Sequence, residues 1–315
     1  MYKSIRKIVL EPGQIIPLNF DYVFTGIFND IKNIDILESF LDCWFDKEDF
    51  YFKDKVKILK RSLGINNKKE KAKQIDLLVE LDNQIINVEM NNGISKPGVI
   101  DRNVVYASKI HGSQLKYGEN DYSKIGKTIQ INLNSDYNQE RLRERYYLKN
   151  EEGKILTEKL EIDMLDLKLG SKMCYDKSSR YYRLARWCKV FTATSKEEFE
   201  NALGDDLMSK KSKEKLVEEV EKYCSDEEAI EIYTGYSKQE MEYNTLKKIN
   251  EDLKKTNTDL KDQIKKSKKD LENQLKNSIQ LQDTVVQLHK NGVPDEIIMK
   301  SLNIDEKQLN EYLEN

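Results

Sequence analysis

Histidine is scarce in this chain of 315 residues, which contains only His111 and His289. The four cysteines lie far apart and form no Cys-x-x-Cys pair. These counts argue against a zinc site or a disulfide framework, and they leave few residues for a Ser-His-Asp or Cys-His mechanism. We interpret His111, in SKIHGSQL, as an ordinary, partly buried helix residue. Any catalytic chemistry is therefore expected to depend on carboxylates.

Long apolar runs are also missing. No segment approaches the length of a membrane span, and the start of the sequence lacks the apolar core of a secretory signal. Hydrophobic residues nevertheless make up 38% of the chain and charged residues 35%, which is enough apolar material for a globular core. We therefore expect a cytoplasmic protein with no membrane partner.

The net charge of −3 gives the whole molecule no strong attraction for nucleic acid. Two segments are nevertheless locally basic. Residues 53–74 hold nine Lys and Arg against two acids, and residues 172–189 hold six against one, interleaved with Tyr and Trp. Basic residues beside aromatic rings suit phosphate contact and base stacking, and a solvated helix face is the alternative. The candidate DNA-binding residues in these segments are Lys71, Lys73, Arg180 and Arg183.

Apolar periodicity predicts an alternation of helices and strands over the first three quarters of the chain. The expected helices cover PLNFDYVFTGIFNDI, residues 34–45, residues 99–117 with a stop at Gly118, and much of residues 181–237. The expected strands are the two halves of KQIDLLVELDNQIINVEMNNG, residues 127–133, and a hairpin made by residues 144–150 and 155–169.

The C-terminal part is predicted to be helical and separate. Residues 240–283 carry a thin apolar stripe with polar interruptions, which indicates an imperfect coiled-coil seam and a candidate homodimer interface, or else a solvated helix. Breaks at Gly292 and Pro294, with a cap at Asp305, predict short helices that form a helix-turn-helix-like tail or a small packing module. The predicted domains are 1–238, 239–284 and 285–315.

Acidic residues interrupt the apolar hairpin that contains LDNQ. Asp82 and Asn83 suit a two-residue turn because both tolerate positive φ. With that turn, the numbers of cross-strand partners sum to 165, so Asp76 lies opposite Glu89. Strand alternation then places Asn91 on the same face as Glu89.

Two carboxylates directly across a strand pair repel each other, and a divalent cation between them would reverse that penalty. Oxygen ligands of this kind suit Mg²⁺, or Mn²⁺ as a substitute. The pattern therefore predicts a metal site at Asp76 and Glu89. The alternative is a surface hairpin whose acids face solvent.

The pattern QIDLL followed by NVEMN resembles the D…(D/E)-x-K core of PD-(D/E)XK nucleases. The order of features resembles, more specifically, the PD-(D/E)XK nuclease family transposases, which include the Rpn recombination-promoting nucleases. The resemblance covers roughly the first 235 residues. The residues that carry it are the helix signature Asp21-Tyr22-Val23-Phe24 through Phe28, the strand Glu89-Met90-Asn91, and Arg102, Tyr106, Gln114, Gly118 and Tyr122.

The resemblance implies a restriction-endonuclease-like α/β core, with a mixed central sheet flanked by helices and an α-helical C-terminal extension. It implies a DNA endonuclease that hydrolyses phosphodiester bonds with Mg²⁺ bound by Asp76 and Glu89. Asp21 is then an accessory acid, with a helix cap as the alternative. Gln114 and Arg102 are expected to orient water or contact phosphate.

Two positions depart from the family pattern. Asn91 stands where the fold generally uses Lys and this family often uses Gln, and Thr25 stands where the helix signature usually has Lys. An amide can hydrogen-bond a water molecule or a phosphate, so Asn91 is expected to position the attacking water, but it supplies no charge and cannot act as a general base. We therefore keep two hypotheses, an active nuclease and a catalytically inactive DNA-binding or protein-interaction member that retains the fold.

Overall fold

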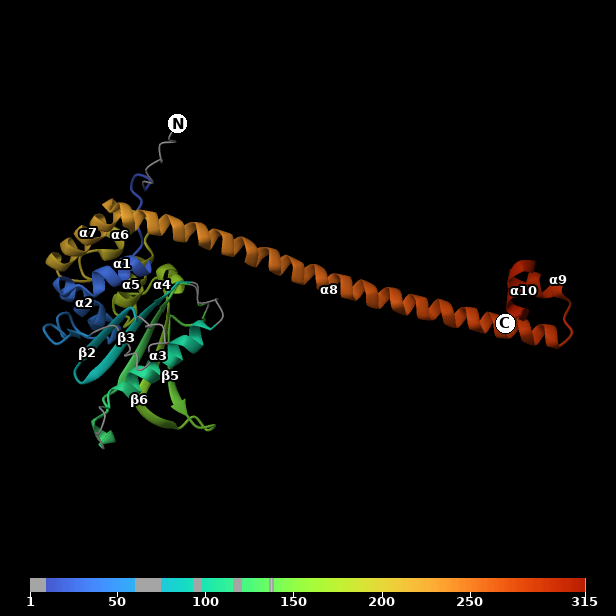
Figure 1. Ribbon diagram of the computed structural model, residues 1–315, viewed down its shortest axis with the longest axis horizontal. Coiled ribbons are helices and arrows are strands. Elements are labelled where there is room, and N and C mark those ends of the chain that lie inside the picture. The colour runs from blue at the N-terminus through green and yellow to red at the C-terminus, as the bar shows by residue number, and fades with distance from the viewer. Residues whose placement is uncertain are drawn as a thin grey trace, which may run out of the picture. The chain divides into compact units, whose positions relative to one another are not determined.

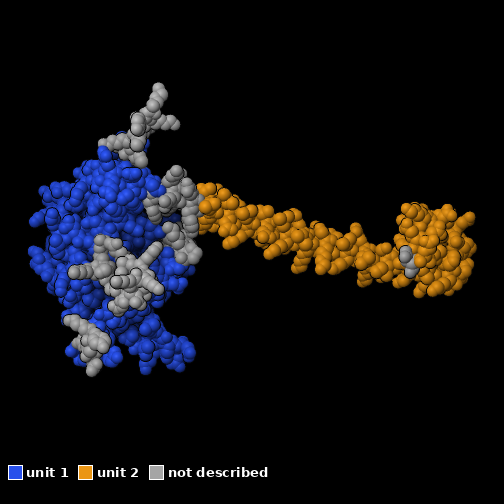
Figure 2. Space-filling model, viewed as in Figure 1, with its two compact units in different colours: residues 1–236 blue, residues 237–315 orange. Residues whose placement is uncertain are grey.

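The chain divides into two compact units, residues 1–236 and residues 237–315 (Figure 2). Helix α8 (Glu227–Lys290) begins in the first unit and continues into the second. The further predicted boundary at residue 284 stays a prediction. The computed structural model (Figure 1) describes residues 10–59, 75–92, 98–115, 121–135, 137 and 139–314, and for residues 236–244 it describes the backbone alone.

A mixed six-stranded sheet organises the first unit, with the strand order β1-β2-β3-β4-β6-β5. Strands β3, β4 and β6 are parallel to one another, and the other neighbours pair antiparallel. The strands are β1 (Lys57–Ile58), β2 (Leu77–Leu81), β3 (Gln84–Asn91), β4 (Thr128–Asn134), β5 (Arg143–Lys149) and β6 (Ile155–Asp166).

The β2/β3 hairpin has the predicted turn and register. Asp82 and Asn83 form the turn with φ values of 47° and 60°, in the left-handed region that a tight hairpin turn needs. Leu77 pairs with Val88, and each pair down to the turn keeps the predicted sum of 165. Asp76 and Glu89 are the next residues beyond the Leu77–Val88 pair, so the observed register places them opposite each other, as predicted.

One face of the sheet packs against helices α1 (Asp21–Phe28), α2 (Ile34–Trp44) and α5 (Tyr182–Thr192), and with them forms the main core. Apolar residues three and four apart give each helix a buried stripe. The rings of Phe28 and Trp187 have centroids 6.2 Å apart, so α1 and α5 meet in an aromatic cluster. Further helices of this unit are α6 (Lys196–Leu203) and α7 (Lys210–Ser225), with 3-10 turns at Ile31–Asn33 and Tyr122–Lys124.

Helix α3 (Val99–Ser113) covers the opposite face and connects the parallel strands β3 and β4 (Figure 1). Its Tyr106 and Ile110 pack with Leu78 in a second, smaller core. The helix ends at Ser113 and not at residue 117, because the next residue, Gln114, turns its side chain toward β4. The predicted stop at Gly118 lies outside the described residues.

The β5/β6 hairpin also ends earlier than predicted. The prediction extended the second strand to residue 169, but β6 ends at Asp166 and helix α4 (Leu167–Lys172) begins there. The Asp166 carboxylate accepts a hydrogen bond of 2.8 Å from the backbone N–H of Leu169, which caps the new helix. The cap therefore overrides the alternating pattern.

The second unit ends in a small helical core. Helices α9 (Asp295–Leu302) and α10 (Glu306–Glu314) pack on the end of α8 through the buried residues Val285, Ile298 and Leu309. The predicted cap is confirmed, because Asp305 Oδ1 accepts a hydrogen bond of 2.7 Å from the backbone N–H of Gln308. In the part of the chain that the structure describes, no helix combines the length and apolarity that a membrane crossing requires.

The predicted fold class is an α/β protein with a mixed central sheet, flanking helices and a helical C-terminal extension. The structure confirms this fold class.

Candidate active site

Asp76 and Glu89 come together where β2 begins. The backbone N–H of Asp76 lies 3.4 Å from Glu89 Oε1, and the Asp76 carboxylate accepts a hydrogen bond of 2.8 Å from the backbone N–H of Met90. Asn29, at the end of α1, donates a hydrogen bond of 2.7 Å to the backbone carbonyl of Asp76. The hairpin register and α1 thus hold two acids side by side.

Glu89 is the buried member of this pair, with an exposed fraction of only 2%. Burial raises the pKa of the Glu89 carboxyl to about 8, and the neighbouring charge of Asp76 is the second cause. The Asn87 amide, which donates a hydrogen bond of 3.1 Å to Glu89 Oε1, and the positive charge of Arg102 act in the opposite direction. When both carboxyl groups are ionised, Asp76 and Glu89 repel each other, and a cation bound between them would relieve that repulsion.

Asn91 is held at both ends of its side-chain amide. Its Oδ1 accepts a hydrogen bond of 2.5 Å from Arg102 Nη2, and its Nδ2 donates one of 3.0 Å to Asn134 Oδ1. Arg102 comes from α3, which lies over this face of the sheet, and its guanidinium also lies 5.8 Å from the centre of the Tyr106 ring. A positive charge thus stands beside the third position of the carboxylate motif, although that position itself is an amide.

A row of buried polar side chains continues from Glu89 across the sheet beneath α3. Asn87 Nδ2 donates a hydrogen bond of 2.8 Å to Gln130 Oε1, and Gln130 Nε2 donates one of 3.1 Å to Asn132 Oδ1. Asn132 Nδ2 in turn donates to the backbone carbonyl of Asp163 at 2.9 Å. The sequence prediction missed this row. Its signal in the sequence was β4, where every second side chain is polar.

Asp21 lies at the C-terminal end of β3, beside the cluster. Asn92 Nδ2 lies 3.4 Å from Asp21 Oδ1 and donates a hydrogen bond of 2.5 Å to the backbone carbonyl of Asn19. Ser135, which follows β4, donates to Asn92 Oδ1. Asp21 is the first residue of α1, and the N-cap position belongs to Phe20, so the structure does not support the helix-cap alternative.

Gln114 lies apart from the carboxylates. Its Nε2 donates a hydrogen bond of 2.7 Å to Thr128 Oγ1, and its Oε1 accepts one of 2.9 Å from the backbone N–H of Gly126. Thr128 starts β4, four residues before the strand partner of Glu89, which places Gln114 about 13 Å along the sheet. We therefore propose no catalytic role for Gln114.

The predicted DNA-binding residues divide into three groups. Lys71 and Lys73 lie outside the described residues, and Arg102 belongs to the carboxylate cluster. Arg180 lies two residues before α5, and Arg183 lies in the first turn of that helix. Arg180 Cζ is 4.7 Å from the centre of the Tyr181 ring, and both side chains line an open groove of about 1000 Å³.

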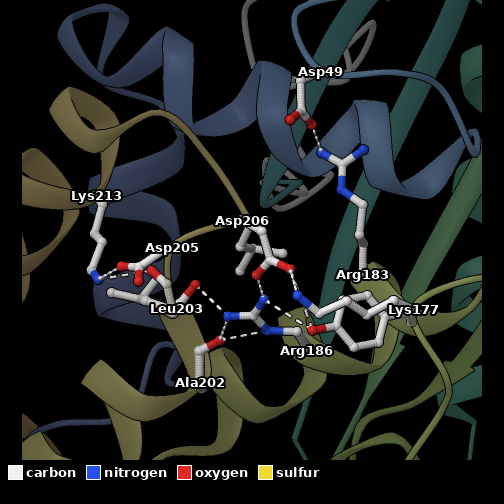
Figure 3. Close-up of polar contacts among 12 residues, drawn as sticks. Asp49, Lys177, Arg183, Arg186, Ala202, Leu203, Asp205, Asp206 and Lys213 are labelled. Carbon is white, nitrogen blue, oxygen red and sulfur yellow. Dashed lines mark hydrogen bonds and ion pairs between the residues drawn. The ribbon is translucent and has the colours of Figure 1, made fainter.

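Arg183 and its neighbours are engaged inside the fold (Figure 3). Arg183 pairs with Asp49 and donates a hydrogen bond of 2.9 Å to the backbone carbonyl of Lys47. Arg186 donates to the backbone carbonyl of Ala202 at 2.9 Å, near the end of α6, and pairs with Asp206. Part of the basic character of residues 172–189 therefore serves packing, because cations stabilise helix C-termini.

The carboxylate pair fits a hard divalent cation. In the described ranges, no group of three or more His, Cys, Asp or Glu residues is placed to hold a metal ion. Mg²⁺ needs no such group, because it is commonly held by one or two carboxylates together with water and substrate phosphate. Burial and the charge of Asp76 raise the pKa of Glu89, so a cation beside this carboxyl would stabilise its charged form.

A mixed sheet with two acids on its central hairpin and a helix crossover above them defines a nuclease-like α/β protein. The model of the PD-(D/E)XK nuclease family transposases matches residues 18–250, which include every strand of the sheet. The chain therefore belongs to this family, whose nucleases are generally phosphodiester hydrolases that use a divalent metal ion. No curated protein and no solved structure matches the chain.

Proposed function

We propose that this protein is a DNA endonuclease that hydrolyses phosphodiester bonds with Mg²⁺, or Mn²⁺ in its place, bound by Asp76 and Glu89. The observation that carries the proposal is the convergence of these two carboxylates, one of them buried, on the face that Arg102 also reaches. Family membership supports DNA as the substrate.

The bound cation would polarise a phosphate oxygen and lower the pKa of a bound water molecule. Glu89 must be deprotonated to act as a ligand, so loading the site at neutral pH releases its proton. The backbone N–H of Met90 and the Asn87 amide fix the two carboxylates from the sheet side. Their orientation therefore does not depend on flexible loops.

Arg102 supplies the positive charge that Asn91 lacks. Its guanidinium donates to Asn91 Oδ1, and its remaining N–H groups can contact a phosphate oxygen as a planar fork. One N–H of the Asn91 amide donates to Asn134 and its Oδ1 accepts from Arg102, so Asn91 positions Arg102, and its second N–H can still contact the attacking water. Asp21, at the end of β3, remains the proposed accessory acid.

DNA contact beyond the scissile phosphate is proposed for the groove lined by Arg180 and Tyr181. Arg141 lines the same groove, and Tyr146 adds an exposed ring. Cationic and aromatic side chains together suit the backbone and bases of a nucleic-acid strand. Arg183 is a weaker candidate because Asp49 neutralises its charge.

Plasmid nicking in Mg²⁺ tests the proposal, with wild type compared with Glu89→Gln and Asp76→Asn. Loss of a metal ligand removes several kcal/mol of transition-state stabilisation, so each variant should nick at least about 100-fold more slowly. Glu80→Gln is the matched control, because Glu80 lies on the same hairpin and pairs with Lys57 at 3.4 Å. Equal nicking by wild type and Glu89→Gln would contradict the proposed site.

A catalytically silent DNA-binding protein is the second candidate function. The observation that favours it is the Asn91 side chain, whose amide is neutral and held at both ends. In that case wild type does not nick, whereas wild type and Glu89→Gln shift a labelled duplex equally in a gel. If wild type nicks the plasmid and Glu89→Gln does not, the catalytically silent function is excluded.

A further inference from the structure

Large apolar side chains lie exposed in a row along α8. Leu253 is 61% exposed, Ile264 is 68% exposed and Leu271 is 67% exposed. The other members of the row are Leu246, Ile249, Leu260, Leu275 and Ile279, each at least half exposed. Single exposed apolar residues are ordinary, but a continuous row of this length marks an interaction surface.

The row follows an 11-residue repeat. Residues 253–263 read LKKTNTDLKDQ and residues 264–274 read IKKSKKDLENQ, and a third copy begins at Leu275 with LKNS. The first position of each copy is Leu or Ile, the fourth is Thr or Ser, and the eighth is Leu in the first two copies. The spacing between these positions is therefore 3, 4 and 4 residues.

The repeat explains the polar interruptions of the predicted seam. Thr256 and Ser267 occupy the same fourth position in successive copies, so they are regular members of the seam and not defects in a heptad pattern. Gln263 is the last residue of its copy and falls beside the seam. Eleven residues make three turns of a helix at about 3.67 residues per turn, which keeps the stripe in line with only a slight right-handed drift.

The small polar positions can be covered by a partner without loss of hydrogen bonds. The Thr256 hydroxyl donates a hydrogen bond of 3.0 Å to the backbone carbonyl of Asp252, one turn earlier in the same helix. A buried hydroxyl with a partner in its own helix adds no unsatisfied donor to an interface. The small side chain at the fourth position of each copy also lets a second helix approach closely.

We propose that α8 pairs with α8 of a second copy of this chain, parallel and in register, over residues 246–279. A straight seam with an 11-residue period needs a partner of equal length and equal period, and a second copy has both. In register, each large apolar layer meets itself and each Thr or Ser layer meets itself. The pairing gives one particle two nuclease units.

The apolar surface of the row has the size that a homodimer needs. A Leu or Ile side chain presents roughly 100 Å² of apolar surface, so eight of them at half to two-thirds exposure offer about 500 Å² per chain. A stable interface buries about 800 Å² per partner, of which about 65% is apolar in homodimers. The two values agree, so the row can supply the apolar part of a stable interface, and the polar residues beside it supply the rest.

Sedimentation velocity of the full chain tests the pairing. We expect wild type to sediment as a dimer of 37.0 kDa chains. The double variant Leu260→Lys, Leu271→Lys places four charges in the seam and should raise the dimer dissociation constant at least 100-fold. Lys is a good helix former, so α8 itself is retained and circular dichroism checks this.

The matched control is Thr258→Lys with Asn273→Lys, because both positions lie on the side of α8 away from the seam and the charge change is the same. This variant should remain dimeric. A monomeric wild type, or equal weakening by both double variants, would overturn the proposal.

Cross-linking tests the orientation. In a Cys174→Ser background, which removes the exposed native thiol, Leu260→Cys should form an intermolecular disulfide under mild oxidation and Thr258→Cys should not. A dimer without a cross-link at residue 260 would overturn the parallel register. Neither experiment depends on DNA cleavage, so the pairing and the nuclease proposal can fail separately.

Discussion

Replacing Glu89 by Gln should make the metal-free protein more stable at alkaline pH. Gln has nearly the same shape as Glu and stays neutral, so it removes the buried charge while it retains the packing. Because burial and Asp76 raise the pKa of Glu89 in the folded protein, the native state holds this proton more tightly than the unfolded state. Stability from the protonated form is fully present below the unfolded pKa and is lost as the pH rises toward about 8.

The size of this loss follows from the two pKa values. The interval between the ordinary pKa of 4.5 and the folded value of about 8 corresponds, at about 1.4 kcal/mol per pH unit, to on the order of 5 kcal/mol. A typical domain has a free energy of unfolding of about 5–15 kcal/mol, so the effect is a large fraction of the total. At pH 5 the two proteins should be nearly equal, and at pH 9 Glu89→Gln should be more stable by about this amount.

Urea unfolding followed by tryptophan fluorescence measures the difference. Trp44 and Trp187 are both buried in the main core, so the signal reports on the first unit, residues 1–236, and not on α9 or α10. The buffer contains a chelator, because a bound cation would compensate the charge. Glu80→Gln is the control and should follow wild type at both pH values.

A difference between wild type and Glu89→Gln that is the same at pH 5 and pH 9 would refute the reasoning. It would mean that Glu89 does not carry the buried, repelled charge that the geometry implies. A larger stability of wild type at pH 9 would refute it as well.

Three further predictions concern two neighbours of the Asp76–Glu89 pair, Arg102 and Asn91, and the buried ion pair between Arg143 and Asp163. Arg102→Gln should slow nicking at least about tenfold, whereas Lys109→Gln, an exposed change on the same helix, should not. Asn91→Ala should slow nicking about tenfold without weakening Mn²⁺ binding, because it releases Arg102. Arg143→Met should lower the free energy of unfolding by about 3–5 kcal/mol, measured by urea unfolding, because it leaves the buried Asp163 with only the longer ion pair to Arg145, at 3.7 Å. This loss should grow as the pH rises above about 6, near the pKa to which burial raises Asp163.

The hairpin that carries the site could be predicted from sequence because its determinants are local. Asp82 and Asn83 are residues that accept positive φ, and the strand period of two then fixes every cross-strand pair. The proximity of Asp76 and Glu89 follows from those two facts. The partners of Asn91 could not be predicted in this way, because Arg102 and Asn134 come from other elements.

The buried polar face was missed because alternation does not reveal what covers a strand. In KTIQINL, residues 127–133, polar residues at every second position usually indicate a face in solvent. Helix α3 covers that face instead, so Gln130 and Asn132 are fully buried and bonded to each other. The Arg143–Asp163 pair lies on the other face of the sheet, beside Trp44, and was missed because its members come from different strands.

Two element boundaries depended on single side chains. Asp166 ends β6 by capping α4, although the apolar alternation continues beyond it. Gln114 ends α3 by bonding to Thr128, a contact that the sequence does not reveal. The 11-residue repeat of α8, in contrast, is visible in the sequence, but its spacing does not fit a heptad pattern.

Titration calorimetry of the purified protein with Mn²⁺ tests the central claim most directly. The account predicts that wild type and Glu80→Gln bind one Mn²⁺ per chain near pH 7 and release a proton, and that Glu89→Gln binds none at the same concentrations. Binding by Glu89→Gln equal to that of wild type would contradict the assignment of Asp76 and Glu89 as the metal site.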